Sequence, residues 1–212
     1  MKIVYKLTNS KMRTYNEFQW ELGKWYETTG KGKLCSSSWL HFYNDPLVGM
    51  FMNPAHANIE NPRLFRAEVE GKFLDDHGLK RGYSRARLVE ELPVPQVSLE
   101  QKVRFAILCA KEVYKAKEWN EWADNWLSGK DRTEESAAII TYAAESVAST
   151  ARSAESAFYA AKSAVIAFYV AKSTMFAFYV AESAENAVKS ASIITKSKKI
   201  DLVEIARKAM EE

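Results

Sequence analysis

The sequence places one thiol and one imidazole close together, at Cys35 and His41. Nucleophilic catalysis by such a pair requires a hydrogen bond between the two side chains and a third group that orients the histidine. The sequence points to no such third group, so we interpret Cys35 as a structural cysteine and His41 as a satisfied core histidine. An enzyme that acts through this pair ranks third among our hypotheses, and no catalytic residue is predicted.

Metal binding has no better support in the sequence. His41, His56 and His77 lack the close spacing of metal ligands, and the sequence contains no Cys-x-x-Cys motif. We therefore predict neither a metal site nor another cofactor.

The segment Thr28–Lys33 combines two glycines with Lys31 and Lys33. Glycines allow the backbone to approach a phosphate closely and lysines supply positive charge, although a solvated hairpin loop explains the same residues. Arg85 and Arg87 could add a basic strand edge, and nearby aromatic rings could hold a nucleotide by stacking, whereas strand charges more often face solvent. The candidate ligand- or partner-binding residues of this half are Trp20, Trp25, Tyr26, Lys31, Lys33, His41, Arg85 and Arg87.

After Gly129 the sequence contains neither glycine nor proline, and an Ala-Phe-Tyr motif recurs at Ala157, Ala167 and Ala177. Its tyrosines, Tyr159, Tyr169 and Tyr179, are core residues or line a face for a partner protein. A triplet of a charged residue, a serine and a small residue also recurs in this half. Its spacings would make the triplets wind around a single straight helix. We therefore expect several helices that fold back into a bundle.

Composition excludes several classes of protein. A formal charge of +3 is too small to indicate a nucleic-acid binder, and it also argues against an acidic DNA mimic. The charged opening segment does not resemble a signal peptide, and the two cysteines suit a reducing bacterial cytoplasm. The apolar runs at 164–171 and 174–181 are short beside the roughly 20 residues of a membrane span, so no membrane association is expected.

Residues 1–95 are predicted to form a small mixed α+β domain. Strands are expected at 2–8, 18–22, 24–27, 64–69 and 84–92, with a bulge at Gly23 between the second and the third. Asn44 and Asp45 can cap a short helix over 46–52, which Asn53-Pro54 is expected to stop. Pro93-Val94-Pro95 marks the domain boundary because it continues neither a central strand nor a helix.

Residues 96–212 are predicted to form an alanine-rich all-α bundle, which makes the fold class α+β overall. Ser98 and Gln101 have the spacing of a capping box that opens a helix over 99–116. Trp119, Trp122 and Trp126 share one face of a second helix that ends near Gly129, and we interpret them as core residues. A last amphipathic helix is expected over 201–212.

The first half resembles an uncharacterised domain family that is common in phages and prophages. The resemblance rests on Tyr5-Lys6, residues 18–27, Leu34-Cys35, Leu40-His41, Asn44-Asp45-Pro46 and residues 66–71. Of that family's Gly-Phe-His-Ala-Cys core, Trp39–Tyr43 keeps only the histidine.

The second half resembles an alanine-rich helical domain family of proposed immunity proteins. The resemblance rests on residues 104–110, the tryptophan helix and the alanine-serine-aromatic repeats. Together the two resemblances imply a phage or mobile-element accessory protein that acts by binding.

Two hypotheses lead. The first is a non-enzymatic phage protein that binds and inhibits a bacterial host protein or complex, with a defence system as the favoured target. The alternative is a sponge that sequesters a signalling nucleotide through the first domain. Homo-oligomerisation through the helical half could accompany either one.

Overall fold

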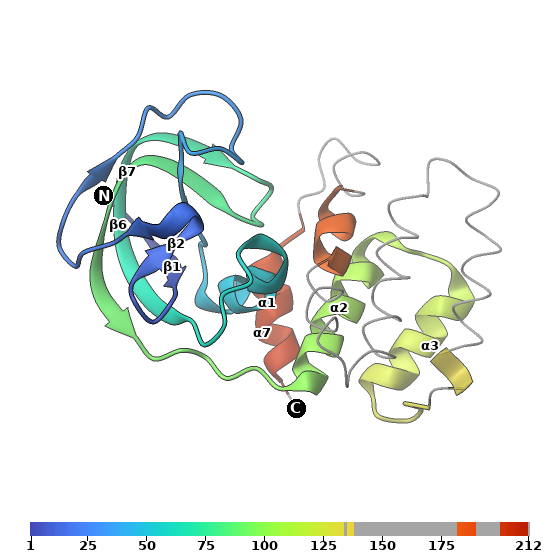
Figure 1. Cartoon of the computed structure of the whole chain (residues 1–212). Helices are drawn as coiled ribbons and strands as arrows, with labels where there is room; N and C mark the ends of the chain where they lie inside the picture. Colours follow the sequence, from blue (N-terminus) through green and yellow to red (C-terminus); the bar gives the residue numbers. More distant parts are fainter. Residues whose placement is uncertain (134, 138–181, 190–199, 212) are drawn as a thin grey trace. The chain divides into compact units, whose positions relative to one another are not determined.

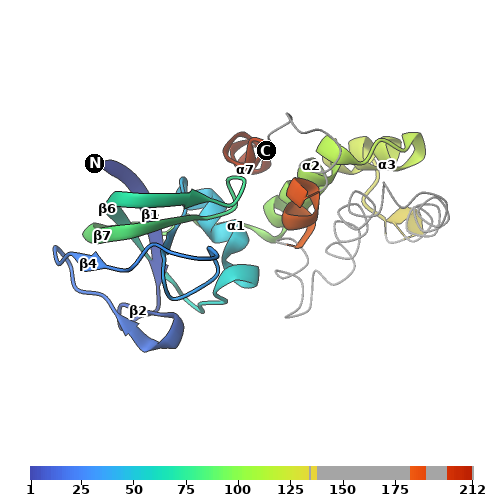
Figure 2. The same cartoon turned by 90° about the horizontal axis from the view of Figure 1, so that it is seen from above.

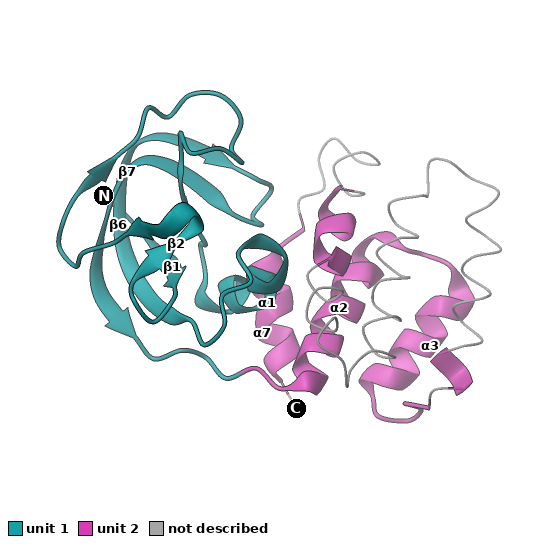
Figure 3. Cartoon of the chain, in the orientation of Figure 1, with its two compact units in different colours: residues 1–96 teal, residues 97–212 magenta. Residues whose placement is uncertain are grey.

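The computed structural model describes residues 1–133, 135–137, 182–189 and 200–211. The chain divides into two compact units, Met1–Gln96 and Val97–Glu212 (Figure 3). The first unit contains an antiparallel sheet, and the described part of the second contains helices, which confirms the mixed α+β class (Figure 1).

The sheet of the first unit is built around one long hairpin, β6 (Arg63–Asp75) and β7 (Arg81–Leu92). β1 (Lys2–Thr8) lies beside β6 and β4 (Tyr26–Glu27) lies beside β7 (Figure 2). β5 (Leu40–Phe42) also pairs with β7. Beyond β5, Tyr43 exchanges two backbone hydrogen bonds of 2.8 and 2.9 Å with Tyr5 of β1. Strand pairing therefore returns to β1 and closes the sheet on itself.

The core of this unit follows from alternation along the strands. On β6 the side chains of Phe65, Ala67 and Val69 are buried, while Arg66 and Glu68 between them face the other side of the sheet and remain partly exposed. Alternation of this kind is typical of an antiparallel sheet with one face toward the core. The core cluster of this unit comprises Val4, Trp20, Leu40, Phe42, Phe65, Ala67, Val69, Tyr83, Ala86 and Leu88.

The helix α1 (Pro46–His56) begins as predicted but ends four residues later. Asp45 caps it by accepting a hydrogen bond of 2.8 Å from the backbone N–H of Leu47. The prediction that Asn53-Pro54 stops the helix is wrong. A proline near the end of a helix removes only one backbone hydrogen bond, and the buried Asn53 side chain secures the end of the helix by bonding both backbone groups of Ile59 at 2.9 and 3.1 Å.

The predicted strand-bulge-strand unit around Gly23 is also wrong. Phe18–Gln19 (β3) pairs with β2 (Arg13–Thr14) in a separate two-stranded sheet, with the short helix η1 (Tyr15–Glu17) between them. Of the two segments predicted as strands, only 24–27 contributes a strand, β4, to the main sheet. Gly23 has a φ of +79° and donates a hydrogen bond of 2.7 Å to Leu88 O, so it turns the chain from one sheet toward the other.

The predicted strands at 64–69 and 84–92 are confirmed in position but are longer in the structure. β6 continues to Asp75 and β7 begins at Arg81, because the two strands stay paired beyond a bulge between Glu70 and Phe73. Gly71 in this bulge has a φ of +81°.

The second unit contains α2 (Leu99–Val113), α3 (Lys117–Leu127) and α7 (Leu202–Met210). The capping box is confirmed, since Ser98 Oγ accepts from the Gln101 backbone N–H at 3.1 Å and Gln101 Oε1 accepts from the Ser98 backbone N–H at 2.8 Å. α2 ends three residues before the predicted Ala116 because Tyr114 is extended. The three tryptophans of α3 are buried, as are Leu202, Ile205, Ala206 and Ala209 of α7, as predicted.

Two serines of the predicted triplets, Ser136 and Ser183, lie in the described part of the chain. Ser136 donates a hydrogen bond of 3.1 Å to Thr133 O, close by in the sequence. Ser183 is fully buried and donates a hydrogen bond of 3.0 Å to Ala106 O, which ties the helical residues 182–189 to α2. The three Ala-Phe-Tyr motifs, with Tyr159, Tyr169 and Tyr179, lie outside the described residues. In the segments that are described, no helix combines the length and the hydropathy needed to cross a bilayer.

Candidate functional site

Trp25 lies against two arginines of β7. The guanidinium carbon of Arg85 is 4.1 Å from the centroid of the indole ring, and that of Arg87 is 4.9 Å away. All three side chains are partly exposed. Stacking of this kind is a cation–π interaction, for which arginine and tryptophan are the most favourable pair.

Three carboxylates hold these arginines in place. Arg85 forms ion pairs with Glu27 at 2.7 Å and with Glu70 at 2.9 Å, and Arg87 pairs with Glu68 at 2.6 Å. The strand register explains the pairs, because Glu70 lies opposite Arg85 and Glu68 lies opposite Arg87 across the hairpin. We call these six residues, Trp25, Glu27, Glu68, Glu70, Arg85 and Arg87, the Trp25 cluster; its formal charge is −1.

Of the other two aromatic candidates, Trp20 belongs to the core and Tyr26 packs against it. Trp20 is 1% exposed, donates its indole N–H to Thr14 Oγ1 at 3.1 Å, and packs edge-on against Phe42 at a centroid distance of 6.0 Å. Tyr26 is half-buried and packs against Trp20 at 5.0 Å. Trp20 is therefore a core residue without a face for a ligand.

The glycine-lysine segment is a loop whose glycine serves packing. Gly30 is buried with a φ of +56°, and a Cβ atom there would lie 2.8 Å from Ser84 Cβ. The side chains of Lys31 and Lys33 are exposed, and among the described residues no hydrogen bond or ion pair joins them to the Trp25 cluster.

The imidazole of His41 is already engaged. Its Nε2 lies 2.6 Å from Leu34 O, and since a carbonyl oxygen only accepts, Nε2 carries the proton. Burial lowers the pKa of His41. Cys35 is exposed, and no hydrogen bond links it to His41 in the part of the chain that the structure describes. Nε2 is thus not available as a base toward Cys35.

Lys6 is a residue that sequence reasoning missed. With Val4 and Thr8 it lies on the inner face of β1, where its ammonium donates to His41 O at 2.7 Å and lies 5.2 and 5.4 Å from the ring centroids of Phe42 and Trp20. No ion pair to a carboxylate is found for it among the described residues. Burial lowers the pKa of Lys6 to about 7. The sequence did contain a signal for this placement. Side chains alternate between the two faces of a strand, so a strand over 2–8 puts position 6 on the same face as position 4.

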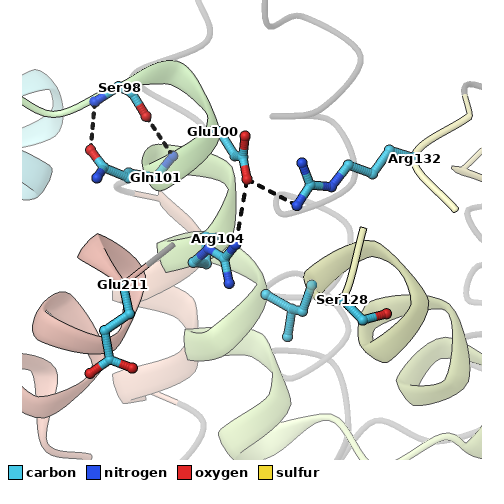
Figure 4. A pocket seen from close by; sticks show the side chains of 8 residues that line it. Ser98, Glu100, Gln101, Arg104, Ser128, Arg132 and Glu211 are labelled. Carbon is cyan, nitrogen blue, oxygen red and sulfur yellow. Dashed lines mark hydrogen bonds and ion pairs between the residues drawn. The ribbon is translucent and has the colours of Figure 1, made fainter. Parts of the chain in front are cut away.

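A second candidate region lies within the second unit, at the amino end of α2. A polar hollow of about 630 Å³ is lined by Ser98, Glu100, Gln101, Arg104, Leu127, Ser128, Arg132 and Glu211 (Figure 4). Its arginines come from different segments of the chain, so no local sequence pattern marks them as a site. Across the described ranges, no group of three or more potential ligands is placed to hold a metal ion.

Comparison with known proteins gives one match. Residues 2–100 match the model of a domain of unknown function, DUF7666. The first unit therefore contains an uncharacterised domain, which confirms that part of the resemblance. No curated protein and no solved structure matches the chain. The phage origin and the resemblance of the second half stay predictions.

Proposed function

We propose that this chain is a non-enzymatic phage or prophage protein that binds and inhibits a bacterial host factor, with a defence system as the favoured target. It would act in the cytoplasm of the host through the Trp25 cluster of its first unit. The observation that carries the proposal is a partly exposed tryptophan that stacks on two anchored arginines.

The cluster has the properties of an interface hot spot. Tryptophan and arginine are enriched among the residues that dominate protein–protein binding energy. Because Arg85 and Arg87 are held by three carboxylates from the two neighbouring strands β4 and β6, they lose little rotamer entropy when a partner covers them. A partner protein could also bury the ion pairs intact, without separating their charges.

The alternative, a nucleotide sponge, has less support at this cluster. A phosphate would meet a formal charge of −1 and would have to displace Glu68 or Glu70 to reach a guanidinium. Trp20 offers no stacking face, since it is buried. The sponge hypothesis keeps Lys31 and Lys33 as its phosphate-binding candidates.

For the second unit we infer an alanine-rich all-α bundle that resembles proposed immunity proteins. Support comes from the buried small residues Ala184 and Ala187 and from the bond between Ser183 and α2, which show close approach of helices at one triplet. Tyr159, Tyr169 and Tyr179 would then supply core packing or a second partner face, and the bundle could mediate homo-oligomerisation.

The test is affinity capture from bacterial lysate with the full chain and its Trp25→Ala variant. We expect a host protein that the wild type captures and the variant does not, because truncation of a hot-spot residue typically weakens binding by about 2 kcal/mol or more. Tyr15→Ala is the matched control, since Tyr15 is 86% exposed and lies outside the cluster.

Circular dichroism of each variant checks the fold, and Arg87→Gln serves as a second probe of the cluster. Capture that survives both Trp25→Ala and Arg87→Gln would contradict the proposed surface. A turnover activity that His41→Ala abolishes would contradict the non-enzymatic function.

A further inference from the structure

Arg104 is a mostly buried cation with few partners. Its side chain is 15% exposed, yet its single contact with a carboxylate in the described chain is a long one, 3.4 Å from Nη2 to Glu100 Oε1. A guanidinium carries five N–H donors. In the described chain the Glu100 contact engages Nη2 alone, so the remaining donors of Arg104 are available to an acceptor that enters from solvent.

Arg132 brings a second guanidinium to the same carboxylate. Its Nη2 lies 2.9 Å from Glu100 Oε1, its Nε donates to Trp126 O at 2.9 Å, and its guanidinium lies 4.7 Å from the ring centroid of Trp126. Arg132 is thus fixed in position. Figure 4 shows the Glu100 carboxylate between the two arginines, so that one acidic oxygen serves two cations.

Both arginines line the hollow at the amino end of α2, which we call the α2 hollow. The positive end of a helix dipole favours anions at that position. A volume of about 630 Å³ falls within the usual range for small-molecule sites. The two acidic residues that also line the hollow, Glu100 and Glu211, would compete with a bound anion.

We infer that the α2 hollow binds a small anionic ligand, through a phosphate or carboxylate group that Arg104 and Arg132 hold between them. Arginine suits either group because its planar N–H donors match two oxygens at once. The site is independent of the Trp25 cluster, since it belongs to the other unit.

The experiment is titration calorimetry of the full chain with two probes, inorganic pyrophosphate and succinate, which separate phosphate from carboxylate recognition. We expect the wild type to bind at least one of them. Arg104→Gln and Arg132→Gln should each weaken that binding about tenfold or more, since each removes a charge-assisted hydrogen bond.

Glu100→Gln tests the electrostatic argument in the opposite direction. It removes the carboxylate that occupies both guanidinium groups, so the same probe should bind several-fold more tightly. Arg13→Gln is the matched control, because Arg13 is an exposed, ion-paired arginine of the first unit. Circular dichroism of every variant keeps loss of binding distinct from loss of fold.

Three results would overturn the inference. One is an absence of heat with both probes; another is equal binding by wild type, Arg104→Gln and Arg132→Gln. The third is weaker binding by Glu100→Gln, because it would mean that the carboxylate supports the ligand rather than competes with it. A failed lysate capture would not bear on this site.

Discussion

Lys6→Met should make the first unit more stable and remove much of its pH dependence. Burial lowers the pKa of Lys6 from 10.5 to about 7. Between these values the unfolded chain binds a proton that the folded chain does not, so the free energy of unfolding rises with pH across that window. The stabilisation is complete above the unfolded pKa and is lost as pH falls toward the folded pKa.

The structure allows an estimate of the size. This shift in the pKa of Lys6 means that the charged side chain destabilises the folded state by about 5 kcal/mol at low pH, since one pKa unit is about 1.4 kcal/mol. Two cation–π contacts oppose the penalty by about 1–2 kcal/mol together, and loss of the hydrogen bond to His41 O costs the variant about 1 kcal/mol more. The net gain expected for Lys6→Met near neutral pH is about 2 kcal/mol.

Urea unfolding followed by tryptophan fluorescence measures this gain. Wild type and variant are each measured at about pH 7.5 and at about pH 9.5. Between these two pH values the free energy of unfolding should rise by up to about 2 kcal/mol for the wild type and by much less for the variant. The comparison cancels other titrating groups, such as Tyr43, whose pKa is raised by burial. Lys31→Met, at an exposed lysine, is the control. Parallel pH profiles for wild type and Lys6→Met would refute the reasoning.

Three further changes test the fold. Gly71→Ala should destabilise the first unit by about 1–3 kcal/mol in urea unfolding, because φ is +81° there and the new Cβ would clash with Ser84 Oγ; an unchanged midpoint would contradict that backbone geometry. Ser98→Ala should cost about 1 kcal/mol through loss of the cap of α2, measured by hydrogen exchange of the α2 amides, which must speed up. Phe51→Ala should lower thermal stability strongly, by about 3–5 kcal/mol, since Phe51 is 1% exposed; a loss below about 1 kcal/mol would mean that this side chain is not core.

The elements that depend on residues close together in the sequence could be predicted from it. The β-like run over 2–8 predicted β1 with its bounds, and the Ser98–Gln101 spacing predicted the start of α2, because both signals lie in neighbouring residues. Gly23 was misread for the opposite reason: its role depends on Leu88, which lies far away in the sequence. The continuation of α1 through Pro54 likewise depends on contacts beyond the helix.

The candidate sites were less predictable than the fold. Trp25, Arg85 and Arg87 were named from residue type, but their carboxylate partners follow from a strand register that includes two bulges. A bulge changes the cross-strand partner of every later residue, and the sequence alone does not show where a bulge lies. Arg104 and Arg132 come together only through the packing of α2 and the segment after α3, which no local pattern encodes.

The order of strands along the chain has a consequence for synthesis on the ribosome. β1 is made early, but its partner lies in β6, where Lys2 pairs with Val69, a separation of 67 residues. At about 5–20 residues per second, β1 waits several seconds for that partner, with Val4 and Leu7 still uncovered. An unpaired apolar strand can pair with other chains. The nascent protein is therefore most prone to aggregation before the long hairpin emerges, and slower translation upstream of β6 should lower its yield.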